Sequence, residues 1–505
     1  MELKSKERAG ARCLAVFGTG SDVGKSVVAT ALCRVFNEDG VKVAPYKAQN
    51  MSNNSGVTPE GLEMGRAQIV QAEAAGLPPD VDMNPILLKP TSETGSQVVL
   101  HGEVYKSSNA GKHHANKETL FAEACGSLDR LKAMVDLVVI EGAGSCAEVN
   151  LMSRDIVNMR MARYADAPVI LVADIHKGGV FAQIVGTLAC LPEDLRHTIA
   201  GFIINRFRGD VALFKNGVDW IEEKTGKPVL GVLPWYKHIR IEAEDSVVIE
   251  KLPPTSAAHI KPPAIAVIRL PHISNFTDFH ALGAVKELNL HFIEKPVSLD
   301  RFAAVILPGS KNTRSDLNWL HATGWTGAIS AYSQGGGHIL GVCGGYQMMG
   351  RTVRDPDGLE GQPGQTPGLD LLPVETELKA PKTTTLTGFS WEGNAGHGYE
   401  IHMGTTVRMG GRPLFEVRTR NGRPAAGEEG CISENGRFMG TYAHGLFDTA
   451  DITAKWLRAI GLNKLTVGTT DGLAARQKEY GKLAHYFRRH IDMAHIKELA
   501  LGAGR

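Results

Sequence analysis

Hydrophobic residues in the first half of the chain fall into short continuous runs, separated by longer stretches in which they recur with a helical period. The runs rich in Val, Ile and Leu often end in Gly, Asp or Asn, which is typical of buried parallel strands with functional loops at their carboxyl ends. These runs predict an α/β domain with a parallel sheet. The predicted strands are residues 14–17, 41–45, 137–140, 169–173, 199–204 and 229–233.

A proline-rich stretch interrupts this pattern and predicts a linker, after which a second set of runs begins. The second set predicts strands at residues 264–270, 290–293, 303–307, 339–342 and 437–442. Between the last two, residues 351–372 are rich in Gly, Pro, Asp and Gln and predict a long surface connection. A chain of 505 residues is expected to form two or three domains. The predicted parts are a first domain (1–250), the linker (251–263), a second α/β domain (264–455) and a helical extension (456–505).

A glycine-rich loop, GTGSDVGKS, follows the first predicted strand and precedes a helix predicted over residues 26–36. Backbone N–H groups in such a loop bind phosphates, the Lys25 ammonium adds positive charge, and the Ser26 hydroxyl can ligate magnesium. The strict motif has glycine five positions before Gly24, whereas this chain has Thr19 there and a glycine at position 18. We therefore predict a phosphate-binding loop of a variant type.

Polar side chains follow three other predicted strands. Glu141 ends one strand beside the phosphate loop and can hold magnesium together with Ser26. Asp174 ends another strand and lies either near the same phosphates or in a solvated loop. Lys47 belongs to the run PYKAQNMSNNS, where it can stabilise a phosphoryl group or an anionic substrate, or be part of an ordinary polar loop.

The run LGVCGGYQMMG places Cys343 between a predicted strand and a predicted helix. This G-x-C-x-G pattern predicts a nucleophile elbow, in which glycines permit a sharp turn and the helix N-terminus favours the thiolate. A buried cysteine in a glycine-rich turn is the structural alternative. His444 follows the strand at 437–442 and is the candidate base. Backbone N–H groups of Gly309 and Gly344 are candidates for an oxyanion hole.

Composition narrows the classes of partner. Lys and Arg number 55 against 54 Asp and Glu, and no basic run indicates a nucleic-acid or membrane surface. No apolar run is long enough to span a bilayer, and no signal-peptide pattern is found at the start. The seven cysteines are scattered without a C-x-x-C pair, which argues against a disulfide framework or structural zinc and favours a reducing cytoplasm.

Taken together, these motifs resemble the cobyric acid synthase family of glutamine-dependent ligases in cobalamin biosynthesis. The resemblance covers nearly the whole chain and includes the runs VVIEGAGS, DIHKGGVFA, FIINRFRGD, RLPHISNFTD, LPGSKNT, GYEIHMG and TYAHGLF. The front half is also similar to dethiobiotin synthetase and the back half to class I glutamine amidotransferases. The implied fold is a P-loop NTPase-type parallel-sheet domain followed by a flavodoxin-like α/β amidotransferase domain.

The resemblance also implies the chemistry. ATP with Mg²⁺ would activate the peripheral b, d, e and g carboxylates of a corrinoid a,c-diamide, and glutamine would supply ammonia. Many amidotransferases have Glu two residues after the His, but this chain has Leu446, as the family's Cys–His pair allows; what orients His444 is left open. The implied site residues are Cys343 and His444 for catalysis, Thr19, Gly20, Ser21, Asp22, Val23, Gly24, Lys25, Ser26 and Asn205 for the nucleotide, Lys47, Asn50 and Asp174 for substrate or phosphate, and Ser26 and Glu141 for the metal.

Three other functions fit parts of the pattern. They are a synthase that makes the a,c-diamide itself, an enzyme that amidates a cell-wall lipid precursor, and a regulatory P-loop ATPase with a non-catalytic amidotransferase module. The run PYKAQNMSNNS and the segment around RLPHISNFTD favour the cobyric acid synthase family over the first two. The presence of both Cys343 and His444 disfavours the third. The sequence makes no prediction about oligomeric state.

Overall fold

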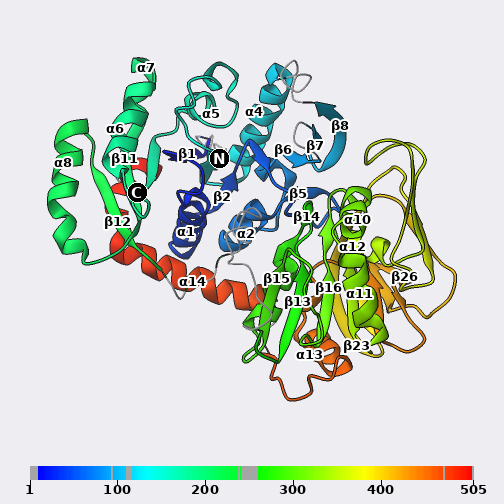
Figure 1. Ribbon diagram of the computed structural model, residues 1–505. Coiled ribbons are helices and arrows are strands. Elements are labelled where there is room, and N and C mark those ends of the chain that lie inside the picture. Colours follow the sequence, from blue (N-terminus) through cyan, green and yellow to red (C-terminus); the bar gives the residue numbers. More distant parts are fainter. Residues whose placement is uncertain are drawn as a thin grey trace, which may run out of the picture.

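A six-stranded parallel sheet forms the centre of the front lobe (Figure 1). The computed structural model describes residues 10–91, 95–109, 117–236, 239, 241, 260–469 and 472–502. All six strands predicted for this half are found, which confirms the parallel α/β fold. In sheet order they are β12 (Val229–Pro234), β11 (Ile199–Phe207), β10 (Val169–Asp174), β1 (Arg12–Gly18), β9 (Leu137–Glu141) and β2 (Val43–Tyr46).

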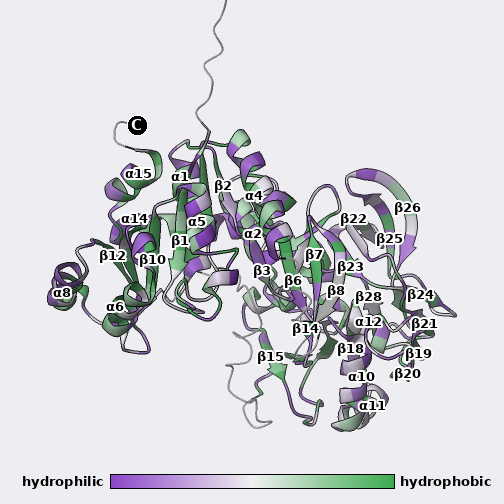
Figure 2. Ribbon diagram, turned by 90° about the horizontal axis from the view of Figure 1, so that it is seen from above, coloured by the Kyte–Doolittle hydropathy of each residue, from purple (hydrophilic) through white to green (hydrophobic). Residues whose placement is uncertain are grey.

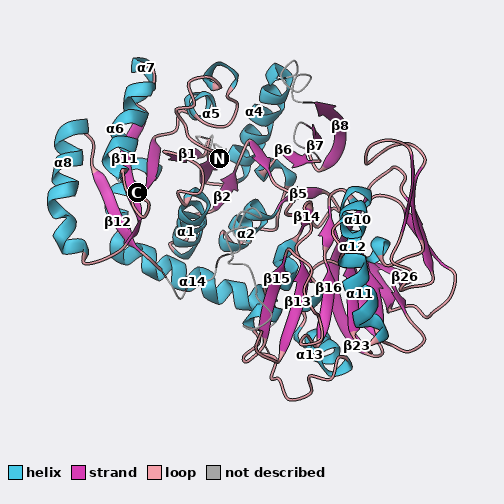
Figure 3. Cartoon of the chain, in the orientation of Figure 1, coloured by secondary structure: helices cyan, strands magenta, loops and turns pink. Residues whose placement is uncertain are grey.

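Helices cover both faces of this sheet (Figure 3). The helix after the phosphate loop buries Val28, Leu32, Val35 and Phe36, whose spacing puts them on one face against the strands. Figure 2 shows hydrophobic residues concentrated in the central strands. The helices of this lobe are α1 (Lys25–Glu38), α2 (Arg66–Ala74), α4 (Lys117–Met134), α5 (Met159–Ala165), α6 (Val180–Cys190), α7 (Glu193–Arg196) and α8 (Lys215–Thr225).

A small sheet extends the front lobe toward the back lobe, and the hydrophobic pattern did not predict it. Its strands, in order, are β3 (Gln49–Met51), β6 (Ile86–Pro90), β7 (Gly95–Leu100) and β8 (Glu103–Asn109). A short hairpin of β4 (Ser55–Val57) and β5 (Glu63–Gly65) lies beside it. The strands β3, β4 and β5 have three residues each, which is too few to show a period of two.

The back lobe has a second sheet with all the predicted strands, and this confirms its α/β class. In order these are β15 (Asn289–Ile293), β13 (Ala264–Ile268), β16 (Ala304–Leu307), β18 (His338–Val342), β28 (Phe438–Thr441) and the antiparallel β27 (Cys431–Ile432). The helices that pack on it include α10 (Thr313–Ala322), α11 (Trp325–Gln334) and the short α12 (Gly344–Met348). The two-stranded β14 (Ile273–Ser274) and β17 (Gly309–Ser310) lie at its edge toward the front lobe (Figure 1).

The prediction of one long surface connection over residues 351–372 is wrong, because part of this stretch forms an antiparallel pair of strands. Val353, Asp355 and Thr366 point inward while their neighbours are more exposed. Turn-forming residues surround these short strands and hide the alternation. The pair belongs to a four-stranded sheet in the order β20 (Gly364–Pro367), β19 (Thr352–Asp355), β21 (Val374–Glu377) and β24 (Thr405–Arg408). A further four-stranded sheet has the order β23 (Asn394–His402), β22 (Thr383–Trp391), β25 (Phe415–Arg420) and β26 (Arg423–Glu429).

The C-terminal helices return to the front lobe. After α13 (Ala450–Ala459), helix α14 (Gly472–His490) packs along α1, and α15 (Met493–Leu501) packs near β1. Tyr480, Leu483 and Phe487 of α14 are buried in the same hydrophobic core as α1. The sequence predicts these helices but not the surface on which they pack. Across the described residues, no helix combines the length and apolar character that a bilayer crossing requires.

Candidate functional sites

The phosphate loop joins β1 to α1, and the Asn205 side chain contacts it. Gly24 has a left-handed backbone with φ of 101°, and a Cβ there would lie 2.1 Å from the Asn205 side-chain nitrogen. That nitrogen donates to the Val23 carbonyl at 2.8 Å, while the Asn205 oxygen accepts from the Arg206 backbone. Glycine is therefore required at position 24. Asn205 contacts the loop itself, and its direct contact with a nucleotide stays a prediction.

Lys25 lies inside the loop that it is predicted to serve. Its ammonium donates to the carbonyls of Gly20 and Gly144, each at 2.9 Å. The loop side chain of Thr19 turns away toward Gln183, to which it donates at 3.2 Å. Both of these acceptors are neutral. An anionic phosphate would bind the Lys25 ammonium more strongly than they do, because hydrogen bonds between charged groups are stronger.

Glu141, fully buried at the end of β9, gathers three donors around its carboxylate. One oxygen accepts from the Ser26 hydroxyl at 2.8 Å and from the Lys47 ammonium at 3.0 Å. The other accepts from the Gln71 amide at 2.5 Å. The structure thus brings Ser26 and Glu141 together as the sequence predicts, and Lys47 joins them, although the three residues come from separate segments.

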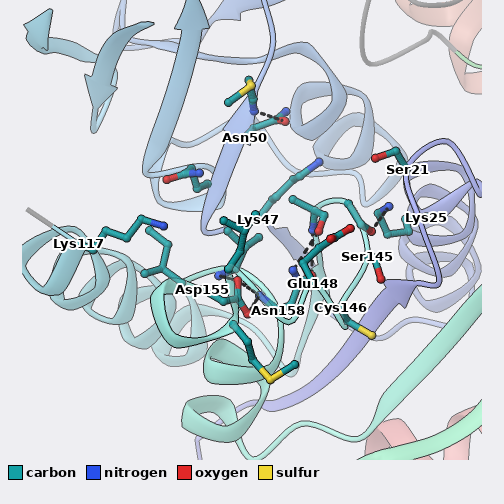
Figure 4. A pocket seen from close by; sticks show the side chains of 18 of the residues that line it. Ser21, Lys25, Lys47, Asn50, Lys117, Ser145, Cys146, Glu148, Asp155 and Asn158 are labelled. Carbon is teal, nitrogen blue, oxygen red and sulfur yellow. Dashed lines mark hydrogen bonds between the residues drawn. The ribbon is translucent and has the colours of Figure 1, made fainter. Parts of the chain in front are cut away.

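A cavity of about 430 Å³ opens beside the loop (Figure 4). Figure 4 shows Lys25, Lys47 and Lys117 around this cavity, with the carboxylates of Glu148 and Asp155 also in its wall. The three lysines favour an anionic ligand, and the volume is in the range of small-molecule sites. The further lining residues are Ser21, Asp22, Gln49, Asn50, Met51, Ala143, Gly144, Ser145, Cys146, Leu151, Met152, Ile156, Val157 and Asn158.

Two of the predicted substrate residues differ in their surroundings. Asn50 lies in the cavity wall, where its amide donates to Gln68 at 2.9 Å. Asp174 is buried at the end of β10 and forms an ion pair of 2.8 Å with Arg206. Asp174 therefore has a positive partner inside the protein, and its contact with phosphate stays a prediction.

Cys343 occupies the elbow between β18 and α12. Its φ of 52° and ψ of −109° are strained for a residue with a side chain. Such strain persists only where close packing enforces it, and the glycines around Cys343 allow that packing. A Cβ at Gly345 would lie 2.0 Å from the Leu307 carbonyl, and one at Gly341 would lie 2.6 Å from the Met349 sulfur. The nucleophile elbow predicted from G-x-C-x-G has its geometry here.

His444 lies next to Cys343, and Asp278 holds it in place. The Nδ1 atom of His444 is 2.6 Å from Oδ2 of Asp278, and the Gly445 N–H donates to the other carboxylate oxygen at 3.0 Å. Tyr399 stacks on the imidazole with ring centroids 5.2 Å apart. Nδ1 faces the carboxylate. The imidazole of His444 is also hydrogen-bonded to the Cys343 side chain.

The charges around His444 favour its protonated form. Burial lowers the pKa of the imidazole, but the Asp278 carboxylate and Cys343 raise it, and the resulting pKa is about 10. A protonated imidazole beside the sulfur stabilises a thiolate, which is the nucleophilic form of cysteine. The arrangement of Cys343, His444 and Asp278 can therefore carry out nucleophilic attack followed by proton donation.

The two predicted oxyanion glycines both lie beside the elbow. Gly344 begins α12 and packs against β17, since a Cβ there would lie 2.8 Å from the Ser310 nitrogen. A Cβ at Gly309 would lie 3.0 Å from Cε1 of His444. Both glycines are thus next to the reacting side chains, and their roles as N–H donors stay predictions.

Asp278 is the functional residue that sequence reasoning missed. It lies 166 residues before His444 and belongs to a short helical turn, Phe276–Phe279, after β14. The run RLPHISNFTD contains it, but the pattern of that run shows only a polar loop. Nothing local indicates that its last residue meets His444. The orienting acid that position 446 lacks is supplied from a different segment.

Comparison with known proteins gives two family matches. Residues 14–248 match a CobQ/CobB/MinD/ParA nucleotide binding domain, and residues 264–452 match a CobB/CobQ-like glutamine amidotransferase domain. Curated relatives match the whole length. The cobyric acid synthase of Chlorobium phaeobacteroides (strain BS1) is 50% identical over 499 residues, with 98% of this chain and 100% of the relative covered. That of Syntrophobacter fumaroxidans is 44% identical over 508 residues, with 97% and 98% covered.

Proposed function

The chain belongs to the cobyric acid synthase family, and we propose that its two sites act in series, one releasing ammonia and the other using it. It is a carbon–nitrogen ligase of cobalamin biosynthesis with a glutamine amidotransferase domain. The observation that carries the proposal is the trio of Cys343, His444 and Asp278 in the same chain as the Lys25 phosphate loop.

In the back lobe, the Cys343 thiolate attacks the side-chain amide carbon of glutamine. The oxyanion that forms is stabilised by the N–H groups of Gly344 and Gly309. His444, protonated and held by Asp278, donates its proton to the departing ammonia, which leaves a thioester on Cys343. The deprotonated imidazole then activates water to hydrolyse the thioester. Glutamate leaves, and the site returns to its starting state.

In the front lobe, the phosphate loop binds ATP and directs its terminal phosphate toward a peripheral carboxylate of a corrinoid a,c-diamide. The carboxylate attacks phosphorus, ADP leaves, and an acyl phosphate forms. Ammonia attacks the acyl carbon and phosphate departs, leaving the amide. Lys25 and Lys47 line the cavity beside the loop, and they would stabilise charge on the transferring phosphoryl group. The b, d, e and g carboxylates are the four proposed positions.

Magnesium fits the residues present. The Ser26 hydroxyl and one Glu141 oxygen are 2.8 Å apart. Adjacent ligands of an octahedral magnesium with bonds of 2.0–2.1 Å are separated by about 2.9 Å. Ser26 and Glu141 would hold the ion, which would neutralise charge on the ATP phosphates. The remaining ligands would be phosphate and water, as is usual for magnesium.

The rival functions are less well supported. A synthase of the a,c-diamide would use the same chemistry. The curated relatives named above are cobyric acid synthases, however, and they match this chain over almost their full length. A regulatory ATPase has no use for a strained cysteine beside a charged imidazole. Free cysteines without a disulfide pattern and a charge balance near zero are consistent with action in the cytoplasm on a small molecule.

The test is a product analysis with the purified chain. Incubation with ATP, magnesium, glutamine and a corrinoid a,c-diamide should give products lighter by about one mass unit per amide, because an NH₂ group replaces each OH. One ADP and one glutamate should form per amide. Ammonium salts should replace glutamine. ATP consumption without any change in corrinoid mass would contradict the proposed function.

A further inference from the structure

The small cavity beside Cys343 is built from both lobes. Lys311, Gln347 and Lys382 of the back lobe line it, and so does Lys89, which lies in β6 of the front lobe. Its volume of about 40 Å³ has room for a few water molecules rather than a whole glutamine. The pocket must therefore widen to admit its substrate, and the seam between the lobes is one of its walls.

A buried ion cluster joins the lobes at this seam. The Glu63 carboxylate, 1% exposed, binds the ammonium of Lys89 at 2.6 Å and that of Lys382 at 2.5 Å. Lys89 also donates to the Ser55 hydroxyl at 2.8 Å. Next to this cluster, the Ser55 N–H donates across the seam to Asn275 at 2.9 Å. Lys89 is thus fixed within the pocket by its own lobe.

The pocket has more positive than negative charge. Lys311 follows β17, and its side-chain ammonium forms no ion pair or hydrogen bond with any residue in the described parts of the chain. Burial lowers the pKa of its ammonium, as does the nearby Lys89. Glu360, the acid that lines the pocket, has a pKa raised to about 7 by burial, and burial lowers the pKa of the Lys382 ammonium to about 7, so each group is about half charged near neutrality. The pocket and the adjoining ion cluster therefore hold three lysines, Lys89, Lys311 and Lys382, against two carboxylates, Glu63 and Glu360.

An excess of buried positive charge beside a nucleophile favours an anionic ligand group. Glutamine carries such a group, because its α-carboxylate lies at the opposite end from the amide that Cys343 attacks. Lys311 has unused hydrogen-bond donors, and Lys89 uses two of its three in the contacts described above. Hydrogen bonds between ammonium and carboxylate are of the stronger, charge-assisted kind.

We propose that the front lobe completes the glutamine site, with Lys89 and Lys311 forming a subsite for the α-carboxylate of glutamine. The inference rests on the proposed role of Cys343 in glutamine hydrolysis. It also links the two sites physically, because β6 pairs with β3, whose residues line the ATP cavity. A movement of β3 on nucleotide binding would be transmitted to Lys89 through that pairing.

The test compares glutamine with glutamine α-amide, which keeps the reacting side chain but lacks the α-carboxylate. The variants are Lys89→Met and Lys311→Met, and the control is Lys379→Met at an exposed lysine near Lys382 in sequence. In both variants, the ratio of kcat/KM for glutamine to that for the α-amide should fall by about 10- to 100-fold, as expected for a lost hydrogen bond between charged groups. Ammonium-dependent amidation should not change, and the control should match the wild type.

The outcomes separate the inference from the function on which it rests. Equal losses with both substrates would show that the lysines are structural, and an unchanged ratio would show that the carboxylate binds elsewhere; either result overturns the subsite. Lys311→Met breaks no ion pair among the described residues, so it remains a fair test if Lys89→Met fails to fold. A wild-type chain that amidates with ammonium but hydrolyses neither substrate would contradict the proposed role of Cys343 itself.

Discussion

The two sites of this chain are assembled in opposite ways. The phosphate loop is contiguous in sequence, and its Lys25 and Ser26 are neighbours at the start of α1. The cysteine site takes Cys343, His444 and Asp278 from three distant segments, and its pocket adds Lys89 from the other lobe. A contiguous site is readable from a motif, whereas a dispersed one shows only its local parts.

The energetics differ in the same way. In the phosphate loop itself, backbone turns and glycines set the geometry, and Asn205 fixes the loop through a single hydrogen bond to Val23. In the back site, function depends on buried charges whose partners come from elsewhere. Breaking a buried pair by removing one partner is costly, because an uncompensated charge is left behind. Variants of Asp278 should therefore alter the charge of His444, which a pH profile can measure.

The largest expected effect separates the two sites by nitrogen donor. Cys343→Ala should reduce glutamine-dependent amidation by about 10³-fold or more, because the nucleophile is lost. Amidation with ammonium salts should continue at the wild-type rate, because the front site accepts ammonia from any source. Rates measured with the two donors, at fixed ATP and corrinoid, check this. An equal loss with both donors would mean that Cys343 is structural.

The complementary change is Lys25→Ala. It should lower amidation with either donor by about 10²–10³-fold, as the loss of an electrostatic contact to a transferring phosphoryl group predicts. Hydrolysis of glutamine alone, measured without ATP, should persist, since the back site is intact. Wild-type rates of amidation in this variant would refute the phosphate-loop assignment.

Asp278→Asn should have a smaller effect that depends on pH. The Asp278 carboxylate helps to raise the pKa of His444 to about 10, so its removal lowers that pKa. His444 then loses its proton at a lower pH, and the alkaline fall in glutamine-dependent activity should move to lower pH. Near neutrality we expect a loss of about 10- to 100-fold, below the 10²–10⁴-fold loss typical of removing the imidazole itself.

Leu446→Ala is the control for Asp278→Asn. Leu446→Ala changes the residue where many amidotransferases carry the orienting acid, and it should leave the pH profile unchanged because Asp278 provides that acid here. The ammonium-dependent profile of Asp278→Asn should also match the wild type. An alkaline limb that stays in place in Asp278→Asn would show that Asp278 does not set the charge of His444.

The secondary structure shows the same difference between features that are visible locally in the sequence and features that form only on folding. The parallel strands of both central sheets are predicted, because they are continuous apolar runs that end in turn residues. The hairpin within residues 351–372 and the short strand β3 are not, because strands of three or four residues in turn-rich surroundings show no period. The packing of α14 on α1 is also missed, since an amphipathic helix shows which face is buried but not on what.

The same limit applies to single residues. Cys343 is recognisable because glycines must surround a strained elbow, and Glu141 because it ends a buried strand next to a phosphate loop. The sequence around Asp278 and around Lys89 contains no motif of this kind. Asp278 is significant only because it lies 2.6 Å from His444, and Lys89 only because it reaches a pocket in the other lobe. Contacts of this kind exist only in the folded chain.

In the proposed reaction, the front site activates a carboxylate with the terminal phosphate of ATP while the back site supplies ammonia. The most direct measurement uses a corrinoid a,c-diamide labelled with heavy oxygen in its free carboxylates, with glutamine as the donor. We expect one labelled oxygen in inorganic phosphate for each amide formed, because the attacking carboxylate oxygen leaves with the phosphate. Label in AMP, or unlabelled phosphate accompanying amide formation, would contradict it.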